Sequence, residues 1–168
     1  MPGLGSLGIM EKSSVPITWN PELDTGIDVI DQQHRRIVDY INALEVANAT
    51  GDRAAVGRTL DELVEYTISH FAFEESLQEE AGYAFSKPHK RVHELFVRRV
   101  GEYVERHRLG DDIGDELFKL LATWLVNHIK RDDGDYVGAV KASMIGIIAE
   151  KRERQDSGWF RRFFRKAA

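Results

Sequence analysis

The chain has 168 residues, the size of one ordinary domain with a single sizeable core. It contains no cysteine, which excludes disulfides, thiolate-held metals and cysteine nucleophiles, so any metal must be held by nitrogen and oxygen. No stretch approaches the roughly 18 apolar residues of a membrane span, and no secretory leader pattern is present. We therefore expect a cytoplasmic protein.

The net charge of -5 is unevenly distributed along the chain. Residues 151–168 carry a local charge of +5, which leaves -10 on the residues before them. An acidic body argues against nucleic acid as a partner, because phosphate binding needs a positive surface. The basic tail therefore needs its own explanation.

The N-terminal part is predicted to be irregular up to the first helix. Residues 1–16 are rich in Gly and Ser and are interpreted as a flexible N-terminal segment. After a turn-like segment at residues 20–24, apolar side chains at helical spacing predict a helix that runs to about Ala49. Residues 50–52 are expected to end this helix and to cap the next one.

The same spacing predicts three further helices, over about residues 56–81, 88–109 and 111–131. Residues 132–135 are expected to interrupt the fourth helix, and a helical stretch from residue 136 to about 151 follows. No segment shows the alternation of a half-buried strand, so the predicted class is all-α. Short turns between similar helices favour an up-down-up-down antiparallel four-helix bundle, which we place at residues 17–150.

Five of the six histidines lie in phase with apolar residues rather than on charged helix faces. His70 and Glu74 are four residues apart, as are His89 and His93, so each pair lies on one face of its helix. The other two in-phase histidines, on the first and fourth helices, are His34 and His128. The four helices are therefore expected to direct ligand-type side chains into one interior.

The predicted burial of Glu74 indicates that this carboxylate needs a cation. A buried, unpaired carboxylate costs on the order of several kcal/mol. Any one histidine taken alone is more often a hydrogen-bonded core residue than a ligand, and converging imidazoles could also bond to one another. A metal, however, would neutralise Glu74 and Asp133 as well, so that one hypothesis explains all seven residues.

The pattern of these residues resembles that of the hemerythrins, and specifically of bacterial hemerythrin domains. The matching stretches are Trp19 and residues 26–27, 30–34, 70–75, 89–93 and 128–133. The resemblance spans about residues 17–145 and covers every ligand position of the family, in order and at the right spacing.

The resemblance implies two non-haem iron ions joined by an oxo or hydroxo bridge. The implied ligands are His89, His93 and His128 for one iron, His34 and His70 for the other, and Glu74 and Asp133 as bridges between them. Asp133 is preferred to Asp132 because the family's aspartate lies five residues past its histidine. Asp132 is then a neighbour without a role.

The implied ligand set leaves one position open for dioxygen. Five imidazoles, two bridging carboxylates and the oxygen bridge fill all other positions of two octahedral irons, and the open one belongs to the iron with two histidines. Ile30, Trp124 and Leu125 are expected to border this oxygen pocket as large apolar neighbours. Their role is to keep water and reductants away from the bound gas.

Reversible dioxygen binding for storage, delivery or buffering is the function that the resemblance implies, without a catalysed reaction. The Glu-x-x-His motif of carboxylate-rich di-iron proteins is absent from the sequence. Two alternatives remain open at this point. One is an oxygen or redox sensor, and the other is a di-iron enzyme with peroxidase or nitric-oxide chemistry at the same site.

Several other residues are interpreted as structural. His107 is expected to be a solvated residue favoured by the dipole at the C-terminus of its helix. Core packing is assigned to Trp19, Phe73 and Phe96, and a solvated face to Glu75, Glu79 and Glu80.

The tail at residues 151–168 combines basic and aromatic residues. If residues 157–166 are helical, the four aromatic side chains gather on one side and the basic ones cover the rest. This pattern predicts attachment to an anionic membrane surface or to a protein partner. The alternative is that the tail docks on the acidic body of its own chain.

Overall fold

The computed structural model describes residues 15–146, and the predictions for residues 1–14 and 147–168 lie outside this range. The elements in chain order are a short 3-10 helix η1 (Pro21–Leu23), α1 (Asp28–Ala49), α2 (Arg53–Glu80), α3 (Ser86–Leu109), α4 (Gly114–Asn127) and a π-helical segment η2 (His128–Asp133). Residues 15–146 contain no strand, so the predicted all-α class is confirmed. None of the helices in this range has both the length and the apolarity that crossing a membrane requires.

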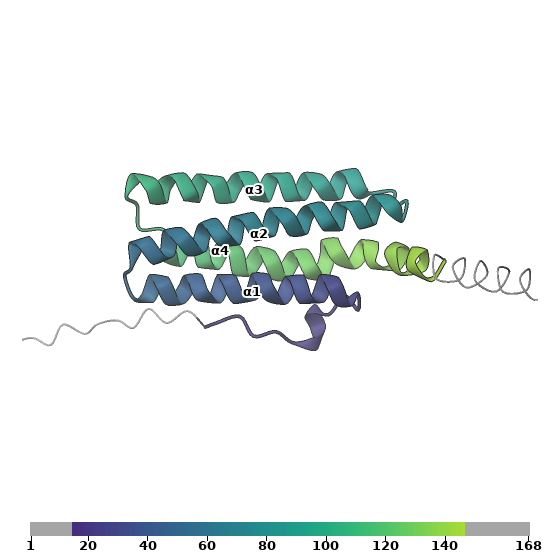
Figure 1. The fold of residues 1–168 in the computed structure, drawn as a ribbon, viewed down its shortest axis with the longest axis horizontal. Coiled ribbons are helices and arrows are strands. Elements are labelled where there is room, and N and C mark those ends of the chain that lie inside the picture. Colours follow the sequence, from purple (N-terminus) through teal and green to yellow (C-terminus); the bar gives the residue numbers. More distant parts are fainter. Residues whose placement is uncertain (1–14, 147–168) are drawn as a thin grey trace, which may run out of the picture.

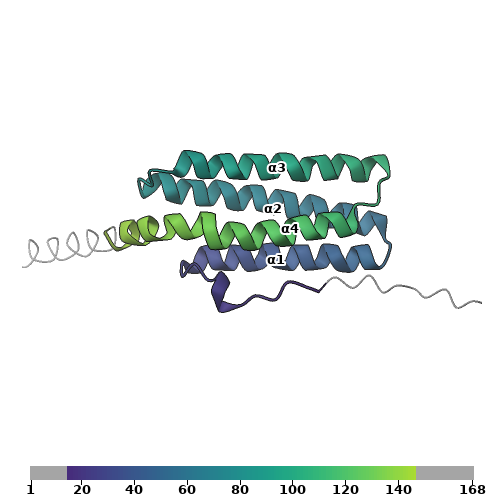
Figure 2. The ribbon, with the colours of Figure 1, turned by 180° about the vertical axis from the view of Figure 1, so that it is seen from behind.

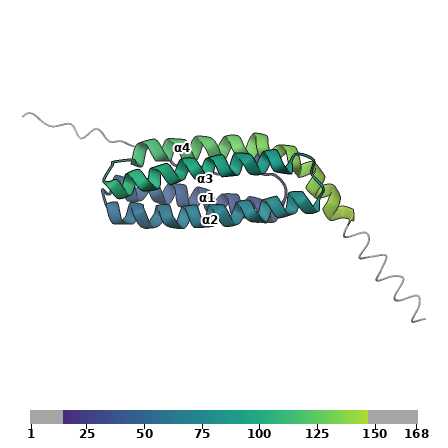
Figure 3. The same ribbon diagram turned by 90° about the horizontal axis from the view of Figure 1, so that it is seen from above.

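The four long helices lie side by side and antiparallel, as Figures 1 and 2 show from opposite sides. α1 contacts both α2 and α4, and α2 contacts α3. The bundle closes where α3 meets α4, because the rings of Phe96 and Trp124 stack with centroids 3.7 Å apart. Figure 3 shows the same four-membered arrangement from above.

The turns follow the polar and glycine signals in the sequence. Asn20 caps η1 by accepting a hydrogen bond from the backbone of Glu22, and Asp52 caps α2 by accepting one from Ala55. Gly110 ends α3 with a φ of 109°, a left-handed conformation that favours glycine. Short turns keep sequential helices adjacent and antiparallel.

The predicted interruption of the fourth helix at residues 132–135 is wrong. After α4 the chain continues through the π-helical turn η2 into a helix over residues 134–146. Gly134 has φ -52° and ψ -33°, which is right-handed helical geometry. The chain therefore widens one turn of a continuous helix where a break was expected.

A layer of buried polar residues separates two apolar clusters along the bundle axis. The larger cluster includes Ile37, Phe96 and Leu125, and the smaller one contains Ile27, Ile30, Tyr136 and Val140. Along α1 the order is Ile30, then His34, then Ile37, and all three are buried. The predicted ligands thus lie inside the core, with apolar packing on both sides of them.

The junction of α1 with α4 requires glycine at position 114. A Cβ atom there would lie 1.8 Å from Oδ1 of Asn48, whose amide donates a hydrogen bond to Asp115. Asn48 would have to give up this position. Gly101, on α3, has no atom within 4 Å of its would-be Cβ and provides a matched control.

We expect Gly114→Ala to lower the free energy of unfolding by about 1–3 kcal/mol through overpacking. Gly101→Ala should raise it by about 0.5–1 kcal/mol, because alanine favours the helix. Urea unfolding of the full chain measures both values. A Gly114→Ala protein as stable as Gly101→Ala would show that Asn48 moves aside without cost.

Candidate metal centre

All seven predicted ligands are brought together in the buried polar layer. Their exposed fractions are 0% for His34, Glu74 and Asp133, 1% for His128, 2% for His93, 3% for His70 and 6% for His89. They come from α1, α2, α3 and η2. The helices α1, α2 and α3 and the turn η2 that continues α4 therefore each contribute at least one nitrogen or oxygen to one interior point.

The two carboxylates lie among the imidazole Nε2 atoms. Oε2 of Glu74 is 3.3 Å from Nε2 of His93, 3.5 Å from that of His89 and 3.9 Å from that of His70. The Asp133 carboxylate is 3.1 Å from Nε2 of His128, 3.2 Å from that of His34 and 3.6 Å from that of His89. These distances leave room for cations between donor atoms that face one another.

Two overlapping groups of residues have ligand atoms within 4.8 Å of one another. One is Glu74, His89, His93 and His128, and the other is His34, His70 and Glu74. This is the division into three and two histidines, with Glu74 shared, that the resemblance implies. Asp133 belongs to neither group, but its two oxygens approach His128 and His34, one from each group.

The π-helical turn explains how His128 and Asp133 both reach the centre. In an α-helix, residues five apart point about 140° away from each other, since each residue turns the helix by about 100°. The wider turn of η2 brings them onto the same side, with Asp133 fully buried. Asp132 reaches the same histidine from behind, and its Oδ2 lies 2.9 Å from Nδ1 of His128.

The outer nitrogens of three histidines have partners that the sequence did not identify. Nδ1 of His70 lies 2.7 Å from Oε1 of Gln33, and Nδ1 of His93 lies 3.0 Å from Oε1 of Glu75. The interpretation of Glu75 as part of a solvated face is therefore wrong. Its carboxylate is 15% exposed and also accepts a hydrogen bond from Lys90. Asp132, first interpreted as having no role, likewise has a partner.

These outer contacts determine which nitrogen of His93 and His128 carries the proton. A carboxylate can only accept, so Nδ1 must donate to Glu75 in one case and to Asp132 in the other. The Nε2 atoms are then unprotonated, and they lie 3.0 Å apart in a buried site. Two lone pairs this close repel each other unless the two nitrogens share a proton or bind the same metal ion.

Many polar atoms of the site have no hydrogen-bond partner within residues 15–146. They are Nδ1 and Nε2 of His34, Nε2 of His70 and of His89, Oε2 of Glu74, and both carboxylate oxygens of Asp133. Buried polar groups are nearly always satisfied in folded proteins. A set of nitrogen and carboxylate donors left unsatisfied at one point fits a pair of metal ions.

The protein itself cannot ionise both carboxylates without help. Burial opposes ionisation of Glu74, yet the imidazole rings of His89 and His93, whose Nε2 atoms lie 3.5 and 3.3 Å from its Oε2, hold its pKa well below the ordinary value. Burial raises the pKa of Asp133 well above its ordinary value, and the charge on Glu74 adds to this. In the metal-free protein one negative charge is therefore accommodated, and a second requires added positive charge.

Tyr136 is a further residue at the site that sequence reasoning missed. It is fully buried, and its hydroxyl donates a hydrogen bond to Oε1 of Glu74. Burial, reinforced by the charges of Glu74 and Asp133, raises the pKa of Tyr136 far above its ordinary value. The only signal in the sequence was its position one turn beyond Asp133. That position indicates the site only when the helix is known to continue past Asp133.

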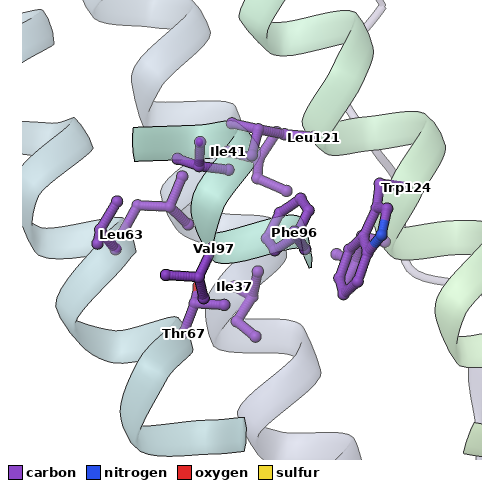
Figure 4. A pocket seen from close by; sticks show the side chains of 11 residues that line it. Ile37, Ile41, Leu63, Thr67, Phe96, Val97, Leu121 and Trp124 are labelled. Carbon is purple, nitrogen blue, oxygen red and sulfur yellow. The ribbon is translucent and has the colours of Figure 1, made fainter. Parts of the chain in front are cut away.

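An apolar cavity of about 20 Å³ adjoins the polar layer (Figure 4). Its lining includes Ile37, Thr67, Phe96 and Leu125, each one turn along its helix from a predicted ligand histidine. Figure 4 shows Phe96 and Ile37 pointing toward one another across it. A cavity with this apolar lining stays dry. Its volume approaches that of a single small molecule.

The three predicted oxygen-pocket residues take different places. Leu125 and Trp124 line the cavity, and the Trp124 ring stacks on His128 with centroids 4.3 Å apart. Ile30 lies on the opposite side of the polar layer, in the smaller apolar cluster, one turn before His34 on α1. Trp124 and Leu125 thus belong to the apolar surface on one side of the polar layer, and Ile30 belongs to the apolar surface on the other side.

The structural interpretations of the remaining residues are partly confirmed. Phe96 is buried and Trp19 packs against the core, but Phe73 is 38% exposed, so its assignment to the core is wrong. His107 is half-buried beside Gly57, at the end of α3 far along the bundle from the site. It has no part in the metal centre.

Comparison with known proteins identifies similar chains over most of the length. Residues 25–140 match the family model described as hemerythrin HHE cation binding domain. A bacteriohemerythrin of Pseudomonas paraeruginosa is 51% identical over 150 residues, which are 89% of this chain and 96% of that protein. A bacteriohemerythrin of Stenotrophomonas maltophilia is 52% identical over the same shares.

A solved structure of wild-type hemerythrin has the same fold. It superposes with a TM-score of 0.72 at 31% identity, and the match covers 75% of this chain and 98% of that one. The names of these relatives are those of oxygen-binding proteins rather than of enzymes. The all-α bundle and the non-enzymatic class predicted from the sequence agree with them.

Acid should destabilise the metal-free protein. Burial lowers the pKa of His34 from 6.5 to about 4, of His70 to about 3 and of His128 to about 2. The unfolded chain therefore takes up protons that the folded protein excludes. The stability that these neutral histidines contribute is complete above about pH 6.5 and falls as the pH drops toward 4, by up to about 1.4 kcal/mol per pH unit for each.

Urea unfolding of the metal-free chain near pH 7 and near pH 5 measures this loss. His70→Gln should reduce the difference between the two conditions, whereas His107→Gln, at the other end of the bundle, should leave it unchanged. Equal unfolding free energies at both pH values would contradict the inferred neutral, buried state of the histidines.

Proposed function

We propose, because this chain belongs to the hemerythrin family, that it binds dioxygen reversibly at two non-haem iron ions held by His34, His70, Glu74, His89, His93, His128 and Asp133. When bound, the irons supply electrons to dioxygen. Dioxygen has no charge and is not basic, so it requires these electrons for tight but reversible binding. We infer the role to be storage, delivery or buffering of oxygen.

One observation in particular supports the proposal. The unprotonated Nε2 atoms of His93 and His128 face each other 3.0 Å apart inside the bundle. Hydrogen bonding among the histidines, the alternative left open by the sequence, would need a second proton on one of these two rings, since both Nδ1 atoms donate to carboxylates. Burial opposes that proton on His128, whose pKa it lowers to about 2. Cations among the donors remove the repulsion and neutralise Glu74 and Asp133 together.

The side chains around the centre favour binding over turnover. Leu125 and Trp124 on one side and Ile30 on the other exclude water, which would otherwise carry protons to the site. Tyr136 holds its proton in the hydrogen bond to Glu74, and its raised pKa keeps it there at physiological pH. A proton held in this way is a poor source for acid catalysis.

Metal stoichiometry and oxygen binding test the assignment. The full chain reconstituted with iron(II) under anaerobic conditions should bind two irons and, on oxygen titration, form a coloured adduct that disappears on deoxygenation. Glu74→Ala and His70→Ala should lose iron or oxygen binding because each removes a donor from the centre. His107→Ala, a histidine of the same chain outside the site, should change neither.

Irreversible oxidation with substrate turnover would contradict the proposal and favour the enzymatic alternative. Two irons and reversible oxygen binding in both site variants would contradict the ligand assignment.

A second proposal concerns residues 157–166, which lie outside the described residues. Their aromatic and basic composition favours attachment of the domain to an anionic membrane surface. Sedimentation with anionic liposomes should carry down the full chain but not a chain truncated after residue 150. Equal sedimentation of both would remove the proposal, and binding of the full chain to a protein alone would favour a partner.

A further inference from the structure

The hydrogen bonds behind the histidines divide the metal centre into two unlike halves. In the group with three histidines, Nδ1 of His93 and Nδ1 of His128 each face a carboxylate, from Glu75 and Asp132. In the group with two, Nδ1 of His70 faces the amide oxygen of Gln33. Nδ1 of His34, the other member, has no partner within residues 15–146 and is buried.

The same two carboxylate-backed rings are also held by stacking. Phe71 lies flat on His93, with centroids 3.7 Å apart and an interplanar angle of 5°, and Trp124 lies on His128 at 4.3 Å and 17°. Glu75 is itself held by Lys90, with Nζ 2.6 Å from Oε2. These rings therefore cannot turn away from their carboxylates without losing packing.

A carboxylate that accepts the Nδ1 proton makes the imidazole a stronger donor through Nε2, because partial negative charge is shared across the ring. An amide oxygen does this more weakly, and an absent partner does not do it at all. We propose that Glu75 and Asp132 are positioning residues that make the three-histidine half of the centre electron-rich. Gln33 and the unpartnered His34 leave the two-histidine half electron-poor.

This inference rests on the proposed metal centre and adds an internal polarity to it. An electron-rich half stabilises the higher oxidation state of its metal, so Glu75 and Asp132 should lower the reduction potential of the centre. Neither residue is among the proposed ligands, and both act only through His93 and His128.

The first measurement uses zinc alone and needs neither iron nor oxygen. In the zinc-loaded full chain, proton and nitrogen NMR should show the Nδ1 protons of His93 and His128 further downfield and slower to exchange than that of His70. Glu75→Gln should move only the His93 signal toward the His70 position, since an amide oxygen replaces the carboxylate. Glu79→Gln, which removes an exposed carboxylate one turn along α2, should move none.

The second measurement is the midpoint potential of the first one-electron reduction of the iron-loaded protein. Glu75→Gln and Asp132→Asn should each favour the reduced form about tenfold, a rise of about 59 mV. Gln33→Glu, which gives His70 a carboxylate, should shift the potential in the opposite direction. Glu75→Ala should in addition weaken zinc binding about tenfold, and Glu75→Gln should restore most of it.

Two results separate this inference from the proposed function. A wild-type chain that binds neither zinc nor iron overturns both. Metal binding with equal Nδ1 signals in the two halves, or with a potential that Glu75→Gln, Asp132→Asn and Gln33→Glu leave in place, overturns only the inferred polarity.

Discussion

The rest of this structure depends on two imidazole nitrogens and two carboxylates that face one another in an apolar interior. The Nε2 atoms of His93 and His128 and the oxygens of Glu74 and Asp133 are buried without sufficient protein partners. Desolvating such groups costs several kcal/mol per charge, and the apolar clusters on either side supply no compensation. Cations bound in this layer would offset that cost and so stabilise the fold. Because α1, α2, α3 and the η2 turn after α4 all contribute to it, the layer also specifies how the helices align along the bundle.

Much of the fold and the inner ligands follows from periodicity. A buried helix face repeats every three or four residues. Histidines in phase with isoleucine and leucine are therefore predicted to be buried, independently of what they bind. The pair His70 and Glu74 and the pair His89 and His93 needed only the geometry of an α-helix to be placed. His128 and Asp133 needed more. Their spacing of five is wrong for an α-helical face, and the polar run that follows looks like a turn. The π-helical turn η2 has no simple sequence signal, because tertiary packing and the buried layer decide it.

The outer partners were missed for a related reason. Glu75 and Asp132 each adjoin a ligand in the sequence, and on an α-helix a neighbouring residue points about 100° away, toward the polar surface. Their function comes from a histidine on an adjacent helix or on the next turn, a relationship that exists only after packing. Tyr136 is the same case, since its hydroxyl meets Glu74 of α2 across the bundle. The prediction for Phe73 was wrong in the opposite sense. It was assigned to the core, but an aromatic side chain can remain partly exposed beside a buried site.

Reversible binding of a neutral gas requires a centre that gives electrons readily and takes them back. The hydrogen-bond acceptors behind the histidines suit this requirement, because they differ between the two halves of the centre. His93 and His128 are backed by carboxylates and held by aromatic stacking, and in the proposed polarity they form the rigid, strongly donating half. His34 has no partner behind it, so its ring adjusts at little cost to hydrogen bonding when the donor set around it changes. Glu74 belongs to both groups, and the hydrogen bond that Tyr136 donates to its carboxylate limits the negative charge there. The side chains that tune such a centre are therefore as much a part of the binding site as those that touch the metal.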